Sequence, residues 1–306
     1  MRRLCLIVFS CCLMLSCSSA PEQPKESTEK KERAAEYTKS GNSFFNQGQY
    51  TQALQLFNLA LNDNISVDNE AGIVQSYNSI GKVYLAAGYL DEAEQHFRNA
   101  ALQAEILRDP LLLAQSKTNL AEVHLERGEL EDAAALLDEA RGQIEEQDAA
   151  RVLAIIYHNI GSVYKKRGEL EEAYRYFQKA LEINTELEQY EEIASNHYMI
   201  ASIYSKRGDY DAARESINLA LSFDKRVENS IGIAKDHFAR GMIEEKAGND
   251  EQAYMSYEKA FQVYQAMHMY RSAASVLPHL IPAAERLGKE EQVRRYRELE
   301  KQLQGS

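Results

Sequence analysis

Glycine recurs along this chain at one fixed interval of forty. Seven glycines share the spacing without an insertion or a deletion: Gly48, Gly88, Gly128, Gly168, Gly208, Gly248 and Gly288. A fixed period of this length is typical of a repeat array, in which each unit packs against its neighbours and one core runs through the stack. The 306 residues therefore need not be divided into two globular domains.

Small and large side chains recur at fixed distances from these glycines. Seven positions before them stand Gly41, Gly81, Ala121, Gly161, Ala201 and Gly241; five positions after them stand Ala53, Ala93, Ala133, Ala173, Ala213, Ala253 and Val293; nine positions after them stand Phe57, Phe97, Leu137, Phe177, Ile217 and Tyr257. Small residues at matching heights let two helix backbones approach, and the large ninth-position residues fill the space between neighbouring pairs. The pattern predicts antiparallel helix pairs whose first helix ends at the glycine.

The residues that carry this pattern resemble the tetratricopeptide-repeat (TPR) family. The matching segments are Tyr77-x-x-Ile80-Gly81-x-x-Tyr84 and Tyr157-x-x-Ile160-Gly161-x-x-Tyr164 in first helices, and Ala93-x-x-x-Phe97 and Ala173-x-x-x-Phe177 in second helices. The resemblance implies an all-α fold, a right-handed α-solenoid. HEAT and armadillo repeats have a similar period but lack this ordered series of small and aromatic positions. Five prolines and no tryptophan in the chain also favour helices.

The period exceeds the family's usual repeat of about 34 residues, so longer helices or connections are expected. We expect six full helix-turn-helix repeats and a degenerate C-terminal capping hairpin, with approximate bounds 34–73, 74–113, 114–153, 154–193, 194–233, 234–273 and 274–306. Pro278 and Pro282 fall in the first helix of the cap and are expected to kink or shorten it. The charged second helix of the cap closes the array with a polar face.

Residues 1–16 have the pattern of an export signal. Arg2 and Arg3 precede an apolar stretch from Leu4 to Leu15, which is too short to span a bilayer. The segment Met14-Leu15-Ser16-Cys17 resembles a bacterial lipobox and is similar to the relaxed versions found in spirochaetes. The resemblance implies removal of residues 1–16 and lipidation of Cys17. Alternatives are lipidation of Cys12 or cleavage of an ordinary secretory peptide near Ala20.

Residues 17–33 contain two prolines and no apolar periodicity, so we expect a disordered tether between the lipid and the folded part, residues 34–306. Ser18 is not the aspartate that retains many lipoproteins in an inner membrane. The resemblance therefore implies a lipid-anchored protein of the bacterial cell envelope, at the outer membrane, with its periplasmic or surface face left open.

Charge and cysteine content exclude several functions. The formal net charge is −12, or −14 once Arg2 and Arg3 are removed (33 basic against 47 acidic side chains), which argues against nucleic-acid binding. The four cysteines all lie between Cys5 and Cys17, so the folded part has no disulfide and no cysteine chemistry. It also lacks a phosphate-binding loop, a Gly-x-Ser-x-Gly turn and a His-Glu-x-x-His pair. We expect no enzymatic activity, no cofactor and no metal.

The TPR resemblance assigns the concave wall to the first helix of each pair. We expect a partner-binding groove that is polar in its early part and aromatic in its later part, formed by Asn78, Lys82, Gln115, Thr118, Asn119, His158, Asn159, Ser162, Tyr198, Ser202, Phe238 and Met242. Polar groups fix an extended backbone and aromatic ones anchor it. Alternatively, Tyr198 and Phe238 pack against the next helix and the amides are merely solvated.

The sequence thus indicates a membrane-anchored scaffold that holds an extended segment or a helix of another envelope protein. Two alternatives remain open at this stage. One is a surface-exposed adhesin that contacts host proteins, and the other is a small-ligand-binding accessory protein with a deep apolar pocket.

Overall fold

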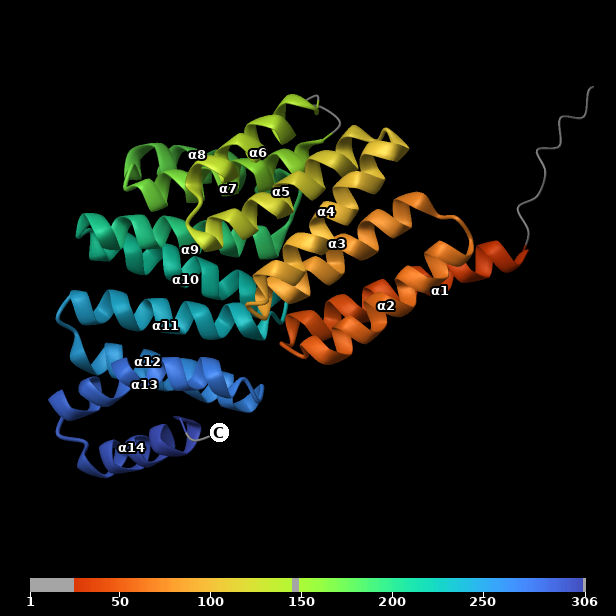
Figure 1. Ribbon diagram of the computed structural model, residues 1–306. Coiled ribbons are helices and arrows are strands. Elements are labelled where there is room, and N and C mark those ends of the chain that lie inside the picture. Colours follow the sequence, from red (N-terminus) through yellow and green to blue (C-terminus); the bar gives the residue numbers. More distant parts are fainter. Residues whose placement is uncertain (1–24, 145–148, 305–306) are drawn as a thin grey trace, which may run out of the picture.

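The computed structural model describes residues 25–144 and 149–304, which form fourteen helices and no strand (Figure 1). The expected signal segment, residues 1–16, and the lipidation site Cys17 lie outside the described residues. Within the described ranges, no helix combines the length and the apolar character needed to cross a bilayer.

The helices pair in sequence into six hairpins and a terminal seventh. The first helices are α1 (Lys25–Asn46), α3 (Glu70–Ala86), α5 (Pro110–Arg127), α7 (Ala150–Arg167), α9 (Tyr190–Arg207), α11 (Ser230–Lys246) and α13 (Tyr270–Arg286). The second helices are α2 (Tyr50–Ser66), α4 (Leu90–Leu107), α6 (Leu130–Gly142), α8 (Leu170–Glu186), α10 (Tyr210–Arg226), α12 (Asp250–Ala266) and α14 (Glu290–Gln304). The predicted all-α solenoid is confirmed.

Two predicted boundaries are corrected. The first helices of the later hairpins begin earlier than the expected repeats, at positions 70, 110, 150, 190, 230 and 270. Helix α1 begins at Lys25, so residues 25–33 are helical rather than part of a tether. This segment consists mainly of good helix formers, and Arg33 at its end makes a 2.6 Å ion pair with Asp63 on α2.

Two kinds of left-handed residue turn the chain between helices. The seven periodic glycines end the first helices with φ between 66° and 86°, as the sequence predicts. Five connections after second helices, all except the partly undescribed one between α6 and α7, use non-glycine residues in the same backbone region, with φ between 52° and 57°, at Asp68, Arg108, Glu188, Glu228 and His268. Both kinds of turn thus rely on a left-handed residue, but only the turn inside a hairpin uses glycine for it.

The two helices of a hairpin approach through pairs of complementary size. A methyl group at the first-helix glycine would lie within 3.0 Å of the aromatic ring of the second helix in the pairs Gly41–Phe57, Gly81–Phe97, Gly161–Phe177 and Gly241–Tyr257. Where the second helix carries the smaller Leu137 or Ile217, the first helix carries Ala121 or Ala201. All of these residues are buried, so the pairs keep the volume of the core nearly constant along the array.

Helix α13 runs through both of its prolines for 17 residues, the same length as α11 and α12. The expectation that Pro278 and Pro282 shorten it is therefore wrong. An interior proline costs about 3 kcal/mol or more, and burial of Leu277 and Leu280, which are 0 % exposed, offsets that cost. Charged α14 then covers this core and contributes its own Tyr296 to it as a buried side chain.

The array curves until its first hairpin reaches distant repeats (Figure 1). Asn46 Nδ2 at the end of α1 donates to Glu191 Oε1 at the start of α9, at 2.8 Å. The turn at Gly48 lies against Met267 and Met269 of the α12–α13 connection, because a Cβ at Gly48 would stand 2.8 Å from Met269 Sδ. The first hairpin thus contacts the fifth hairpin and the junction between the sixth and the seventh.

Candidate functional site

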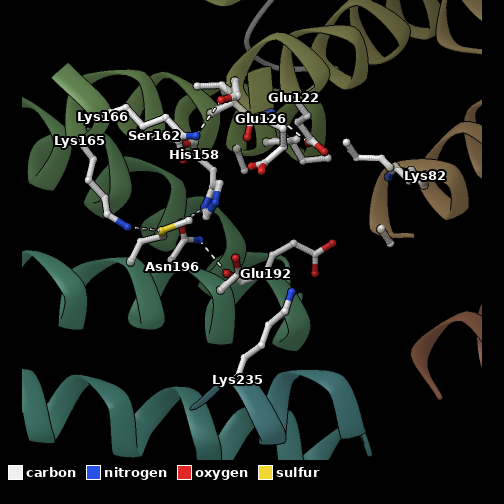
Figure 2. A pocket seen from close by; sticks show the side chains of 18 of the residues that line it. Lys82, Glu122, Glu126, His158, Ser162, Lys165, Lys166, Glu192, Asn196 and Lys235 are labelled. Atoms are coloured by element: carbon white, nitrogen blue, oxygen red, sulfur yellow. Dashed lines mark hydrogen bonds between the residues drawn. The ribbon is translucent and has the colours of Figure 1, made fainter. Parts of the chain in front are cut away.

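The inner wall of the curve carries a groove of about 740 Å³. Most of its lining comes from five successive first helices, α3, α5, α7, α9 and α11. Figure 2 shows that charged and polar side chains from these helices converge on it: Lys82, Glu122, Glu126, His158, Ser162, Lys165, Lys166, Glu192, Asn196 and Lys235. The first helices line the concave side, as the sequence predicts.

Four of the predicted site residues line this groove: Lys82, His158, Asn159 and Ser162. Asn159 Nδ2 donates to Glu122 Oε1 on the preceding first helix at 3.0 Å. Ser162 Oγ donates to the backbone oxygen of His158 at 3.1 Å. The serine hydroxyl is therefore bound to the helix backbone and not to the imidazole, so the two residues do not form a nucleophile–base pair.

His158 is held by α9. Its Nδ1 lies 2.9 Å from Asn196 Oδ1, and Asn196 Nδ2 donates to the backbone oxygen of Glu192 at 2.8 Å. Because the amide oxygen faces the ring, Nδ1 carries a hydrogen and donates. Burial lowers the pKa of His158, which favours the neutral ring with Nε2 as a hydrogen-bond acceptor.

Lys165 is a groove cation with a weak partner. Its Nζ lies 3.3 Å from Met199 Sδ across the groove (Figure 2), and a thioether is a weak acceptor. Burial, followed by the nearby charges of Lys206 and Lys166, lowers the pKa of Lys165 to about 8. Lys166, in contrast, donates to the backbone oxygen of Leu125 at 2.7 Å. Lys165 thus presents an ammonium that an incoming acidic or carbonyl group can stabilise.

Three predicted groove residues prove to be internal. Asn119 Nδ2 donates to Asn78 Oδ1 at 2.9 Å, and Asn78 Nδ2 donates to Ser116 Oγ at 3.0 Å. Thr118 Oγ1 donates to the backbone oxygen of Ala114 at 2.7 Å. Asn78, Thr118 and Asn119 are at most 3 % exposed. Their assignment to a partner-binding surface is corrected, because their polar groups bond within and between adjacent first helices instead.

The residues predicted to form the aromatic end of the groove lie in different places. Tyr198 lines a separate cavity of about 300 Å³. Phe238 packs against the C-terminal core, with its ring centroid 5.6 Å from that of Tyr257 and 5.2 Å from that of His279, and Met242 contacts the same core. Gln115 and Ser202 are half-buried and line neither space.

Sequence reasoning missed several residues that line the groove: Lys165, Glu192, Ser195, Asn196, Met199 and Lys235. Met199 shares its offset from the glycine with Asn119 and Asn159, and Ser195 and Lys235 share theirs with Gln115, so these offsets were selected in other repeats only. Asn196 had a signal of its own in the sequence. The position of Asn196, twelve before the glycine, is Ser76 and Ser116 in earlier repeats and Asp236 in the next, so a polar residue recurs within the packed face of the first helix.

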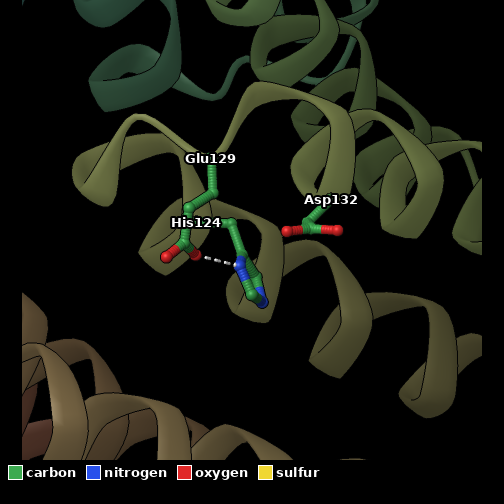
Figure 3. A group of neighbouring side chains, drawn as sticks. All are labelled: His124, Glu129 and Asp132. Atoms are coloured by element: carbon green, nitrogen blue, oxygen red, sulfur yellow. Dashed lines mark hydrogen bonds and ion pairs between the residues drawn. The ribbon is translucent and has the colours of Figure 1, made fainter.

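The described residues contain one group with the composition of a metal site, His124, Glu129 and Asp132, whose ligand-type atoms lie within 4.8 Å of one another (Figure 3). His124 Nδ1 contacts Glu129 Oε2 at 2.6 Å. The histidine lies in the last turn of α5 and Asp132 in the first turn of α6, where helix dipoles favour these charges. Ion pairing and helix dipoles account for the cluster, and we assign no metal to it.

Comparisons with known proteins agree with this architecture. Tetratricopeptide repeat models match residues 74–103, 114–139 and 152–226, which lie in the second to the fifth hairpin. No curated protein matches the chain.

Solved structures share the fold at low identity. A Rap conjugation gene regulator of the plasmid pLS20, in complex with the Phr* peptide, is 16% identical, with 95% of this chain and 80% of that chain covered and a TM-score of 0.68. A Rap protein complexed with competence and sporulation factor is 18% identical, with 89% and 76% covered and a TM-score of 0.66. A signal transduction ATPase with a tetratricopeptide repeat sensor from Pyrococcus horikoshii is 15% identical, with 90% and 45% covered and a TM-score of 0.62.

Proposed function

This chain is a tetratricopeptide-repeat protein, and from that premise we propose that it is a non-enzymatic scaffold that holds an extended segment or a helix of another protein in its concave groove. The observation that carries the proposal is the groove of about 740 Å³, lined by five successive first helices with converging donors and acceptors. An elongated site of this kind suits a polypeptide better than a compact metabolite.

Successive first helices offer complementary chemistry along the groove. Glu122 and Glu126 on α5 and Glu192 on α9 supply acceptors, while Lys82 on α3 and Lys165 on α7 supply donors. An extended peptide exposes both N–H and C=O groups at short intervals, so it needs both kinds of partner along its path. Lys165 is expected to take a carboxylate or carbonyl of the partner in place of Met199 Sδ.

Structures of similar fold support a polypeptide ligand. The Rap regulator of plasmid pLS20 was solved in complex with the Phr* peptide. A solenoid of comparable extent therefore accommodates a peptide, which is what we propose for this groove.

The proposal is tested by site-specific photo-crosslinking in cells. A photoreactive amino acid replaces Ser195, an exposed residue that lines the groove, and in a matched control it replaces Glu182, which is exposed on the second helix α8. Crosslinks to a partner protein are expected at position 195 and not at 182. Equal crosslinking at both positions would show that the groove has no special role.

A substitution then tests the groove chemistry with the captured partner. Lys165→Gln removes one charge-assisted hydrogen bond, worth about 1.5–3 kcal/mol, so affinity should fall by roughly tenfold to a hundredfold with an unchanged melting temperature. Unchanged affinity would remove Lys165 from the site.

We further propose that lipidated Cys17 anchors the scaffold at the outer membrane of a bacterial envelope. The proposal rests on the sequence pattern of residues 1–17. Cys17→Ala should abolish fatty-acid labelling and detergent partitioning, whereas Cys12→Ala should preserve both. The reverse result would move the anchor to Cys12. Protease access on intact cells distinguishes a periplasmic scaffold from a surface protein that contacts host proteins.

A further inference from the structure

A second cavity, of about 300 Å³, lies where the first hairpin meets α9, α10 and α11. Two kinds of side chain in its lining bear on its chemistry. Phe45, Tyr50 and Tyr198 contribute aromatic rings, and Glu191, Asp224 and Asp236 contribute carboxyl groups. The cavity exists because the array curves back on itself, since its two aromatic residues from the first hairpin come from α1 and α2.

Two of the carboxyl groups are deeply buried. Asp224 is 5 % exposed and Asp236 is 2 % exposed. Asn229 Nδ2 donates to Asp224 Oδ1 at 3.0 Å. Among the described residues, Asp236 Oδ2 is buried and receives no hydrogen bond from an N–H or hydroxyl donor. Its hydrogen-bond partner is the other carboxyl group, Asp224, and that bond needs a proton on Asp236. The described part of the protein thus satisfies this acceptor only by protonation, with no cation between the two carboxyl groups.

The packing of the scaffold does not require these acids. The positions of Asp224 and Asp236 are Asn64 and Ser76 in the first and second hairpins, and the position of Asn229 is Asn69. There, Asn64 Nδ2 donates to Ser76 Oγ at 3.2 Å, and Asn69 Nδ2 donates to Asn64 Oδ1 at 2.7 Å. The same junction is therefore built from neutral side chains that satisfy one another.

The acids also act against stability. Burial raises the pKa of Asp224 and of Asp236, and the neighbouring Asp224 charge raises the pKa of Asp236 further. Two carboxyl groups held together in a buried site lower the free energy of unfolding, and this protein uses neutral groups at the matching positions of other hairpins. Such sites are commonly functional.

We propose that this cavity binds a cationic group, a guanidinium or a primary ammonium, between the aromatic rings and the buried carboxyl pair. A bound cation displaces the proton that Asp236 holds against Asp224, so that both carboxylates become charge-assisted acceptors, and the aromatic rings of Phe45, Tyr50 and Tyr198 add the attraction of a ring for a cation. A volume of about 300 Å³ matches the lower end of small-ligand sites. Among the described lining residues the one cation is Lys235, and it is exposed.

The cavity adjoins the groove, because Ser195, Met199 and Lys235 line both. The cavity can therefore be entered by the arginine or lysine side chain of a polypeptide segment that lies in the groove, or by a free amine, and both would meet the same carboxyl groups. The site does not depend on the proposed scaffold function, since a free cation is tested in the absence of any partner.

The test uses the purified chain and two small probes of matched shape, n-butylguanidinium and the neutral n-butylurea. Binding is followed by the saturable rise in melting temperature and by calorimetry. The guanidinium should bind and the urea should not. The double variant Asp224→Asn/Asp236→Asn should weaken guanidinium binding by at least about tenfold, which corresponds to about 1.4 kcal/mol. Because the first two hairpins use neutral residues at these positions, the variant is expected to fold.

Glu182→Gln is the surface control for the loss of a carboxyl group, because Glu182 is exposed on α8 and lines neither cavity. It should bind the guanidinium as the unchanged chain does. Equal binding of the two probes, no saturable binding of the guanidinium, or full binding by the double variant would each overturn the proposal.

A capped pentapeptide with a central arginine identifies the source of the cation. Tighter binding of this peptide than of n-butylguanidinium assigns the cavity to a polypeptide side chain. Equal or weaker binding assigns it to a small amine or guanidine. A citrulline peptide is the neutral control and is expected not to bind.

Discussion

Gly161 on α7 and Phe177 on α8 form a complementary pair, in which a methyl group at the glycine would lie 2.9 Å from Cε1 of the ring. In the third hairpin, the matching positions hold Ala121 and Leu137. The summed volume of the two side chains, and not the volume of either one alone, therefore determines how closely the two helices of a hairpin approach.

A double-mutant cycle tests this reciprocity. Gly161→Ala should destabilise the protein by about 1–3 kcal/mol through overpacking, and Phe177→Leu should destabilise it by a similar amount through an internal cavity. The combined variant reproduces the Ala121–Leu137 pair, so it should recover about 1 kcal/mol or more relative to the sum of the single changes. Urea unfolding gives the three free energies, and strict additivity would contradict the idea.

The buried amide pair between Asn78 and Asn119 is expected to support the fold and not the ligand. Asn78→Ala leaves the Asn119 amide without its acceptor, so the free energy of unfolding should fall by about 1–3 kcal/mol. Gln75→Ala on the same helix changes an exposed residue and should alter it by less than about 0.5 kcal/mol. Partner affinity of the folded Asn78→Ala protein should be unchanged, and a selective loss of affinity would return Asn78 to the groove.

Opposite substitutions in the two kinds of turn should have opposite effects. Gly88 has φ of +83° and Glu188 has φ of +52°. Gly88→Ala forces a Cβ into the left-handed region and should cost about 1–2 kcal/mol, while Glu188→Gly removes one from it and should stabilise the protein by about 0.5–1 kcal/mol. Thermal and urea unfolding measure both, and a loss of stability in Glu188→Gly would show that its side chain has another role.

The buried carboxyl pair predicts a pH dependence of stability. Burial and the Asp224 charge raise the pKa of Asp236 above its unfolded value, so the folded protein holds a proton that the unfolded chain releases. The free energy of unfolding then falls as pH rises from about 4 towards the raised pKa. Asp236→Asn should stabilise the protein at pH 8 by at least about 1.4 kcal/mol, the equivalent of one pKa unit, and the gain should shrink towards pH 4.

Urea unfolding across this pH range is the measurement. The converse change, Ser76→Asp, puts a carboxyl group at the matching position of the second hairpin and should destabilise the protein more at pH 8 than at pH 4. A constant effect of Asp236→Asn at all pH values would contradict the assignment of the slope to this residue.

The hairpins were predictable because each needs a few residues at fixed offsets. Gly48 and its counterparts identified the first turn, and the row that includes Gly161 identified the close approach of helices. The second turn was not predictable in this way. Asp68, Arg108, Glu188, Glu228 and His268 share a backbone conformation but no side-chain type, so composition gave no indication of it.

The candidate site was predicted in part, for a geometrical reason. The offset of a residue from the periodic glycine fixes the direction in which its side chain leaves its own helix. Whether that side chain is buried depends on how the neighbouring first helix is rotated relative to it. Asn78 and His158 share one offset, yet Asn78 is 3 % exposed while His158 lines the groove. The accumulated rotation between hairpins depends on side-chain volumes throughout the core, which the period alone does not specify.

The hydrogen bond between Asn46 and Glu191 has a mechanical consequence. In a solenoid held only by nearest-neighbour contacts, the terminal unit frays independently and the pitch changes freely, as in a spring. Here the N-terminal hairpin is joined to the fifth hairpin by this bond and also rests on Met267 and Met269, so the same contacts oppose fraying at that end and extension of the whole array. Under tension, these contacts can separate while every hairpin stays folded, and the superhelix then lengthens by a change of pitch without loss of its helices.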